Sequence, residues 1–227
     1  MSIFRTHNQT PPVVLNLMIA NAVVFLATSL FRGNFLYENF ALFNVDFRCI
    51  GQEGMTLFHP WQPLTYMFMH GGFSHLFFNM FSLWMFGRTL ELELGWKRFL
   101  IYYIVCGVGA ALFQMGIAQI DLAHLDVGSP MWMRYMQTPT VGASGAIFGL
   151  LLAFGMLHPD AIISLIFPPI AMKAKWFVVV YGILELLLGV SGTMSGVAHF
   201  AHLGGMFWGW LLLLLWRYQD RNRNYYY

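Results

Sequence analysis

The chain alternates between long stretches of apolar residues and shorter polar connections. A transmembrane helix needs about 20 consecutive, mostly apolar residues, and six stretches approach that length. They cover residues 13–31, 74–90, 99–119, 141–157, 176–190 and 197–216. The pattern therefore predicts an all-α, polytopic membrane protein with six transmembrane helices, and we expect residues 1–227 to form a single membrane domain.

Basic residues are spread unevenly over the connections between these stretches. If the N-terminus lies in the cytoplasm, the cytoplasmic side holds nine Lys and Arg residues. The outer side then holds only Arg32, Arg48 and Arg134. Lys and Arg favour cytoplasmic loops, so the pattern predicts cytoplasmic N- and C-termini. The compact six-helix form suggests a bacterial cytoplasmic (inner) membrane. We expect the first stretch to be retained, since it is longer than the roughly 7–15 residues of a signal-peptide core.

The composition agrees with a chain surrounded by lipid. Hydrophobic residues make up 58% and charged residues only 10%, against roughly 25% charged in an average soluble domain. This excludes a disordered chain, a nucleic-acid binder and an ordinary cytosolic enzyme. Two cysteines, Cys49 and Cys106, support neither a disulfide framework nor a cysteine-based metal site.

Polar residues occur inside three of the predicted helices, all toward the outer ends. Such residues are unfavourable in a membrane and mark functional sites. In chain order they are His75 and Asn79, then Ser144, then His199 and His202. The predicted topology allows these side chains to meet at one depth.

Ser144 follows two poor helix formers, Pro139 and Gly142, so a helix is expected to start close to it. The first amides of a helix have no internal partner and can bind a developing oxyanion. The alternative is a capping serine beside a helix-packing motif formed by Gly145 and Gly149.

His202 shares one side of its helix with Gly205 and Gly209, which is the side expected to pack closest to another helix. A histidine there can act as the base that a serine nucleophile needs. The alternative for each histidine of this helix is a buried side chain bonded to a backbone carbonyl, and we favour that alternative for His199.

His75 and Asn79 stand four residues apart on one helix face, where both can donate hydrogen bonds to an oxyanion. Their alternative role is hydrogen bonding between helices. Glu185 is the only acid well inside a predicted helix. It could orient a histidine, line a path through the bundle or simply reach water near the outer end of its helix, and we do not assign it to catalysis. Without a placed acid, the natural arrangement is a Ser–His dyad.

Several segments, in order, resemble those of rhomboid intramembrane serine proteases. They are Gly142-Ala143-Ser144-Gly145, Ala201-His202-Leu203-Gly204-Gly205-x-x-x-Gly209, His70-x-x-x-x-His75-x-x-x-Asn79 and Leu90-Glu91-Leu92-Glu93-Leu94-Gly95. The resemblance spans nearly the whole chain. It implies a six-helix rhomboid-like bundle, substrates that are transmembrane proteins, and no cofactor or metal.

The resemblance also implies a role for each matching residue. Ser144 would be the nucleophile and His202 the general base. The Ser144 N–H, His75 and Asn79 would form the oxyanion hole. His70 would support the active site, and Gly142 would shape the backbone beside the nucleophile.

Two positions depart from the family pattern. Many members carry Trp-Arg where this chain has Trp61-Gln62, which concerns the anchoring of the first outer loop. Some members carry Tyr four residues after the nucleophile, where this chain has Phe148. We expect the ring to stack on the histidine without a hydroxyl bond.

Three other functions compete with proteolysis. A rhomboid-like protein without activity would bind membrane clients, but such relatives typically lack the serine or the histidine. A metal-dependent membrane enzyme would use the histidines, for which the sequence shows no carboxylate partner and no H-E-x-x-H motif. A transporter would show two related halves, and the sequence shows none.

Overall fold

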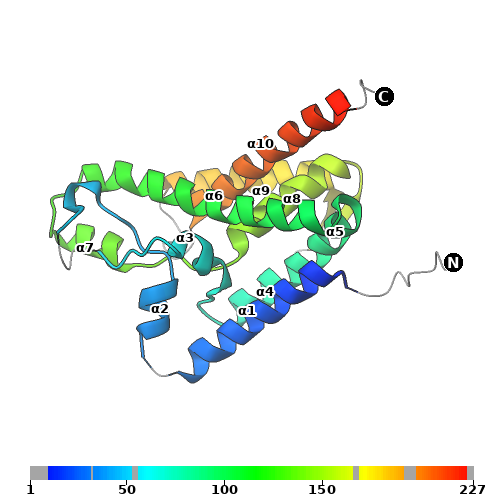
Figure 1. Cartoon of the computed structure of the whole chain (residues 1–227). Coiled ribbons are helices and arrows are strands. Elements are labelled where there is room, and N and C mark those ends of the chain that lie inside the picture. Colours follow the sequence, from blue (N-terminus) through cyan, green and yellow to red (C-terminus); the bar gives the residue numbers. More distant parts are fainter. Residues whose placement is uncertain (1–9, 32, 53–55, 166–168, 192–197, 224–227) are drawn as a thin grey trace.

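The computed structural model describes residues 10–31, 33–52, 56–165, 169–191 and 198–223. It is a bundle of long helices (Figure 1). Five of them are α1 (Pro12–Leu30), α6 (Trp96–Ala123), α8 (Ser144–Leu157), α9 (Ala174–Ser191) and α10 (His199–Arg223). A further helical segment consists of α4 (Phe73–Ser82), the π-helical turn η3 (Leu83–Gly87) and α5 (Arg88–Leu94).

Four of these helices are long and apolar enough to cross a membrane, namely α1, α6, α9 and α10. The fifth, α8, is apolar but has only 14 residues. The chain is therefore an integral, multi-pass membrane protein. The all-α fold class is confirmed for the described part of the chain.

The helix ends differ from the predicted ranges in several places. The correction that matters most for the candidate site concerns the predicted start at residue 141, because α8 begins only at Ser144. Gly142 has a φ of 120°, which is incompatible with a helix and places the turn directly before Ser144. The segment predicted as 74–90 continues to Leu94, and α6 is longer than 99–119 at both ends. The final helix runs on past residue 216 to Arg223, while its predicted start at 197 lies outside the described residues.

The three helices α6, α8 and α10 form the centre of the bundle and pack on one another, with α9 against α8 and α10. The closest approach is between α8 and α10. A Cβ added to Gly205 would collide with the backbone carbonyl of Gly145. Only glycine at position 205 allows this contact, so the packing of the predicted glycine face is as expected.

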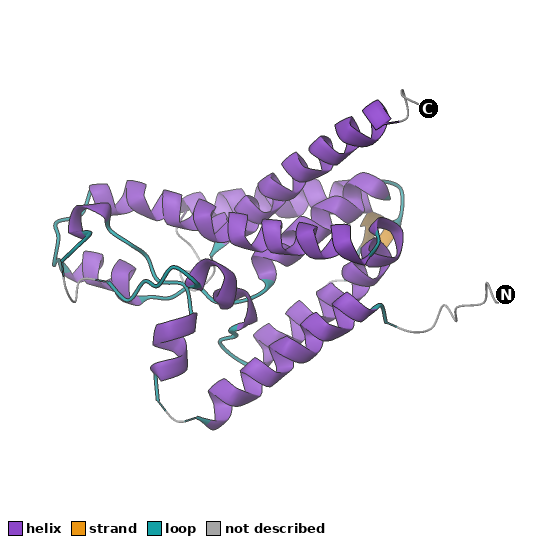
Figure 2. Ribbon diagram, in the orientation of Figure 1, coloured by secondary structure: helices purple, strands orange, loops and turns teal. Residues whose placement is uncertain are grey.

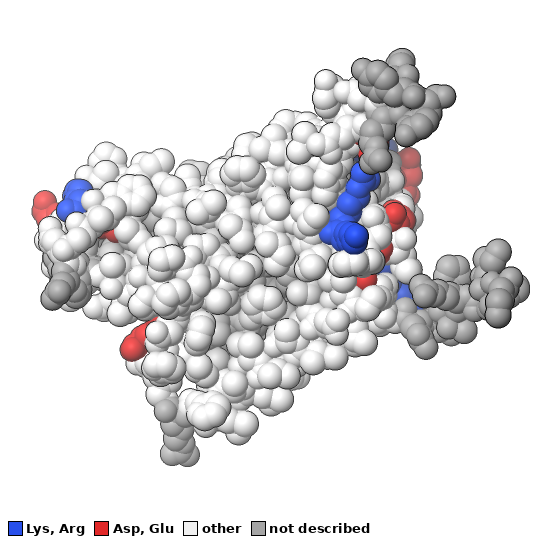
Figure 3. All heavy atoms as spheres, viewed as in Figure 1, with Lys and Arg blue, Asp and Glu red and all other residues white. Residues whose placement is uncertain are grey.

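Charged side chains gather at the two ends of the molecule, with an uncharged band between them on the face shown in Figure 3. One end contains the ion pairs Arg98–Asp220 (2.7 Å) and Lys173–Asp160 (3.0 Å). The start of α1 and the end of α10 both lie at this end (Figure 1). An uncharged band between charged ends is the pattern expected of a protein that spans a bilayer.

The connections contain short elements that the sequence pattern did not predict (Figure 2). The helical ones are α2 (Phe35–Phe40), η1 (Phe47–Cys49), α3 (Gln62–Thr65), η2 (Tyr66–Phe68) and α7 (Pro130–Gln137). Two strands, β1 (Ile162–Ser164) and β2 (Ala171–Lys173), pair antiparallel between α8 and α9. Each strand has three residues, too few for an alternating pattern to be recognised.

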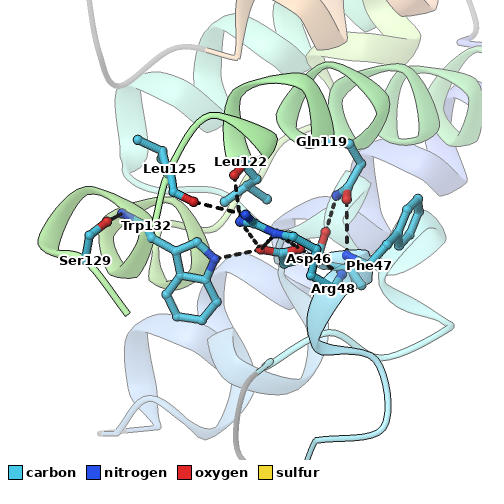
Figure 4. A network of polar contacts seen from close by, with 9 residues as sticks. Asp46, Phe47, Arg48, Gln119, Leu122, Leu125, Ser129 and Trp132 are labelled. Carbon is cyan, nitrogen blue, oxygen red and sulfur yellow. Dashed lines mark hydrogen bonds and ion pairs between the residues drawn. The ribbon is translucent and has the colours of Figure 1, made fainter. Parts of the chain in front are cut away.

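The first long connection is fixed to the α6–α7 end by a buried carboxylate (Figure 4). Asp46 accepts hydrogen bonds from the Arg48 guanidinium (2.7 Å) and from the Trp132 indole N–H (2.8 Å). Arg48 also donates to the carbonyl of Leu122 at 2.7 Å. These contacts, Arg48 foremost, lower the pKa of Asp46 to about 2.

Candidate active site

Ser144 is the first residue of α8, directly after the turn at Gly142. The turn itself is held in place because the Gly142 N–H donates to the carbonyl of Tyr66 at 3.0 Å. The amides of the first turn of α8 therefore lie beside the Ser144 hydroxyl without helical partners. This is the arrangement of a hydroxyl next to an anion-binding helix start.

His202 lies opposite Ser144 in the first turn of α10. Its Nε2 atom is 2.7 Å from the Ser144 Oγ, a hydrogen-bond distance. The Phe148 ring stacks on the imidazole, with ring centroids 4.2 Å apart and planes 5° apart. The expected stacking without a hydroxyl is thus present. The close contact between α8 and α10 at Gly205 holds the helices that carry these two side chains together.

Glu185 of α9 occupies the other side of His202. Its Oε2 atom is 2.7 Å from His199 Nδ1 and 2.9 Å from His202 Nδ1. Glu185 is only 9% exposed, so of its alternatives the contact with a histidine fits the structure and the contact with water does not. The expectation that His199 bonds a backbone carbonyl is wrong for its Nδ1 atom, which bonds this carboxylate.

His75 and Gly142 are in direct contact. A Cβ added to Gly142 would come within 2.7 Å of His75 Nε2, so glycine is needed both for the backbone angle and for space. The buried His70 ring packs edge-on against His75, with centroids 5.0 Å apart. The side chain of Asn79 donates to the backbone carbonyl of His75 at 2.8 Å. No hydrogen bond joins Asn79 to Ser144 among the described residues.

A cavity of about 490 Å³ adjoins this cluster. His75 and His199 line it, together with Gln114, Thr140 and other residues of α6, α7 and α10. The buried Gln114 Oε1 and His199 Nε2 have no hydrogen-bond partner among the described residues. Ser144 and His202 are not among the residues that line this cavity, but its size and the polar groups of His75, His199 and Gln114 suit water beside the cluster.

One group of side chains could hold a metal ion. The ligand atoms of Glu185, His199 and His202 lie within 4.8 Å of one another. The sequence had shown no carboxylate partner for these histidines, and Glu185 supplies one. Two histidines and a glutamate are also the donor set of some zinc enzymes, so this reading needs a test of its own.

Comparison with known proteins identifies the family. The sequence model of the Rhomboid domain matches residues 58–219, which is more than half of the chain.

The chain belongs to the rhomboid family.

Curated relatives of this rhomboid include proteins of a plant, a yeast and bacteria. RHOMBOID-like protein 12, mitochondrial, of Arabidopsis thaliana is 31% identical over 85% of this chain and 55% of its own length. Rhomboid protease AarA of Providencia stuartii is 29% identical over 67% of this chain and 54% of its own length. Putative rhomboid protease YdcA of Bacillus subtilis is 30% identical over 73% of this chain and 71% of its own length. The chain spans about half the length of several of these curated relatives.

Gln62, which departs from the family pattern, fixes the first long loop of this rhomboid by hydrogen bonds. Gln62 is fully buried, and its side chain makes three hydrogen bonds to the backbone. It accepts from the Phe43 N–H (3.1 Å) and donates to the carbonyls of Glu38 (3.1 Å) and Leu57 (2.9 Å). An uncharged amide therefore anchors this loop.

Proposed function

We propose that this rhomboid is a serine endopeptidase that hydrolyses peptide bonds in or near the transmembrane segments of membrane proteins. The observation that carries the proposal is the 2.7 Å contact between the Ser144 hydroxyl and His202 Nε2 inside a membrane-spanning bundle. The named proteases among its relatives support the same reaction class. The alternative is a rhomboid-like protein that binds membrane clients without cleaving them.

The reaction begins with proton transfer from the Ser144 hydroxyl to His202 Nε2. The serine oxygen forms a bond to the carbonyl carbon of the substrate, and the carbonyl oxygen becomes an oxyanion. His202 then gives the proton to the leaving amine as the C–N bond breaks, which leaves an acyl-serine. A water molecule from the adjoining cavity, deprotonated by His202, hydrolyses the acyl-serine and restores the hydroxyl.

The oxyanion is stabilised by the groups around the start of α8. The Ser144 N–H, the His75 ring, which lies against Gly142, and the Asn79 side-chain amide are the donors we assign. One N–H of Asn79 bonds the His75 carbonyl, and the amide has a second N–H to offer. His70 packs against the His75 ring and limits its rotation.

We also propose a bacterial cytoplasmic membrane as the location, with the start of α1 and the end of α10, which lie at one end of the bundle, facing the cytoplasm. The uneven distribution of basic residues supports this orientation. It places Ser144 and His202 toward the outer leaflet, where they would meet transmembrane substrates. The continuous packing of α6, α8 and α10 supports a single membrane domain over residues 1–227.

The test is cleavage of a single-span reporter protein in liposomes by the wild type and by Ser144→Ala and His202→Ala. We expect the wild type to cut, both variants to lose activity, and all three to melt at similar temperatures. A fluorophosphonate probe, which reacts with activated serines, should label the wild type at Ser144 only. Cleavage that survives Ser144→Ala would overturn the assignment. A wild type that binds the reporter without cutting it would favour client binding.

A further inference from the structure

The buried carboxylate of Glu185 has no role in the two-residue mechanism given above. It belongs to α9, whereas the serine belongs to α8 and the histidines to α10. One of its two carboxylate oxygens, Oε2, lies 2.7 Å from His199 Nδ1 and 2.9 Å from His202 Nδ1. A buried carboxylate is unfavourable unless it is paired, and here two imidazoles of the same helix turn surround it.

We propose that Glu185 is a positioning residue of the active site, which holds His202 for proton transfer from Ser144 and is itself held by His199. The proposal rests on the proposed serine-protease function. It extends the Ser–His pair to three helices, in the order Glu185, His202, Ser144.

The two ring nitrogens of His202 have different partners. Nε2 faces the Ser144 hydroxyl at 2.7 Å and must be unprotonated to accept its proton. The proton of the neutral ring must then sit on Nδ1, the atom that lies 2.9 Å from the Glu185 carboxylate. A negative charge at that distance favours this tautomer and stabilises the imidazolium formed when Nε2 accepts the proton.

His199 fixes the carboxylate rather than the serine. Its Nδ1 bonds Glu185 at 2.7 Å, and its ring meets His202 edge-on with centroids 6.4 Å apart. Phe148 restricts His202 to one plane by stacking, and the Glu185 contact fixes the rotation of the ring within that plane. Both constraints together aim Nε2 at the serine oxygen.

The test compares Glu185→Gln with Glu93→Gln, which is a matched control. Glu93 also pairs with a histidine, His158 (2.9 Å), but among the ion pairs at the other end of the bundle. We measure kcat and KM for the reporter in liposomes, together with thermal unfolding. The amide removes the negative charge at nearly unchanged size, so we expect kcat to fall about 100-fold with KM nearly unchanged. Glu93→Gln should retain wild-type kcat.

A second readout does not depend on turnover. In protein with ¹⁵N-labelled histidines, His202 should carry its proton on Nδ1 in the wild type and shift toward the Nε2–H form in Glu185→Gln. His202→Gln identifies the signal. If Glu185→Gln does not fold, His199→Gln replaces it. That variant keeps the Glu185 carboxylate but removes its hydrogen bond to His199, and kcat should fall about tenfold at unchanged KM.

The outcomes separate the two proposals. If the wild type cuts the reporter and a folded Glu185→Gln cuts with the same kcat, or if His202 keeps one tautomer in both, Glu185 has no positioning role. If Glu185→Gln lowers the melting temperature but keeps wild-type kcat, Glu185 only stabilises the packing of α9 against α10. If the wild type neither cuts nor reacts with the fluorophosphonate, the proposed function fails and this inference fails with it.

Discussion

Replacing Gly205 with alanine tests whether the close approach of α8 and α10 sets the geometry of the site. The added Cβ would collide with the backbone carbonyl of Gly145, the residue directly after Ser144. A backbone carbonyl inside a helix cannot rotate away as a side chain can, so the two helices must separate. The separation moves His202, three residues before Gly205, away from the Ser144 hydroxyl.

Two opposing contributions determine the change in stability. Alanine is favoured over glycine within a helix by about 1 kcal/mol. Overpacking a tight contact costs about 1–3 kcal/mol, more where the backbone must shift. We therefore expect Gly205→Ala to be destabilised by roughly 1–2 kcal/mol. A misplacement of about 1 Å can reduce activity on the order of 100-fold, so we expect kcat to suffer far more than stability.

Gly182→Ala in α9 is the matched control. A Cβ at Gly182 would meet only the flexible end of Met206, at 3.5 Å, which is ordinary contact. The helix preference of alanine should therefore leave this variant as stable as the wild type or slightly more so, with normal activity. Thermal unfolding in detergent and reporter cleavage measure both effects. If Gly205→Ala melts and cuts like Gly182→Ala, the glycine contact does not set the position of the catalytic pair.

Three further predictions concern the Asp46 anchor, the Phe148 ring and the Glu185 cluster. The pKa of Asp46 is lowered to about 2 in the folded protein. Its ionised form therefore contributes fully to stability above about pH 4, and this contribution is lost as the pH falls through about 2. Asp46→Asn should flatten the fall in melting temperature over that range, and an acid profile equal to that of the wild type would show that the ionised Asp46 does not stabilise the loop. Phe148→Leu removes a stacking contact worth about 0.5–1.5 kcal/mol. We expect kcat to drop roughly 2- to 10-fold and the melting temperature to fall by only about 1–6 °C. A wild-type kcat would show that His202 is held by other contacts. Reporter cleavage should persist after dialysis against EDTA; activity that disappears and returns with Zn²⁺ would instead favour the metal reading of the Glu185 cluster.

Much of the fold follows from the length and spacing of apolar stretches. Each of the six predicted stretches holds helix in the described part of the chain, because a chain in lipid must satisfy its backbone hydrogen bonds within each segment. The same argument does not determine where each helix begins and ends, because single residues in the connections set those positions. Gly142, with its φ of 120°, moved the start of α8 to Ser144. The anchor around Asp46 joins residues 86 positions apart, and no local pattern encodes such a contact.

The resemblance to the rhomboid family, drawn from the sequence, is confirmed by the match over residues 58–219. The roles assigned to Ser144, His202, His75 and Asn79 stay predictions. Their positions were accessible to reasoning because polar residues in membrane helices are few. The 2.7 Å contact between Ser144 and His202 requires that their two helices be neighbours. The resemblance to the rhomboid family implied this arrangement.

Glu185 shows why one part of the site could not be read from the sequence. A carboxylate two turns from a helix end can reach water or point into the bundle, depending on the rotation of that helix. The pattern of α9 does not settle its rotation, because apolar residues surround the helix on nearly every side. The signal that existed was chemical: an acid retained in an apolar helix needs a partner. The first turn of α10 offered two histidines, and the carboxylate lies within 2.9 Å of both. Of the alternatives that the sequence left open for Glu185, orienting a histidine therefore fits the structure and reaching water does not.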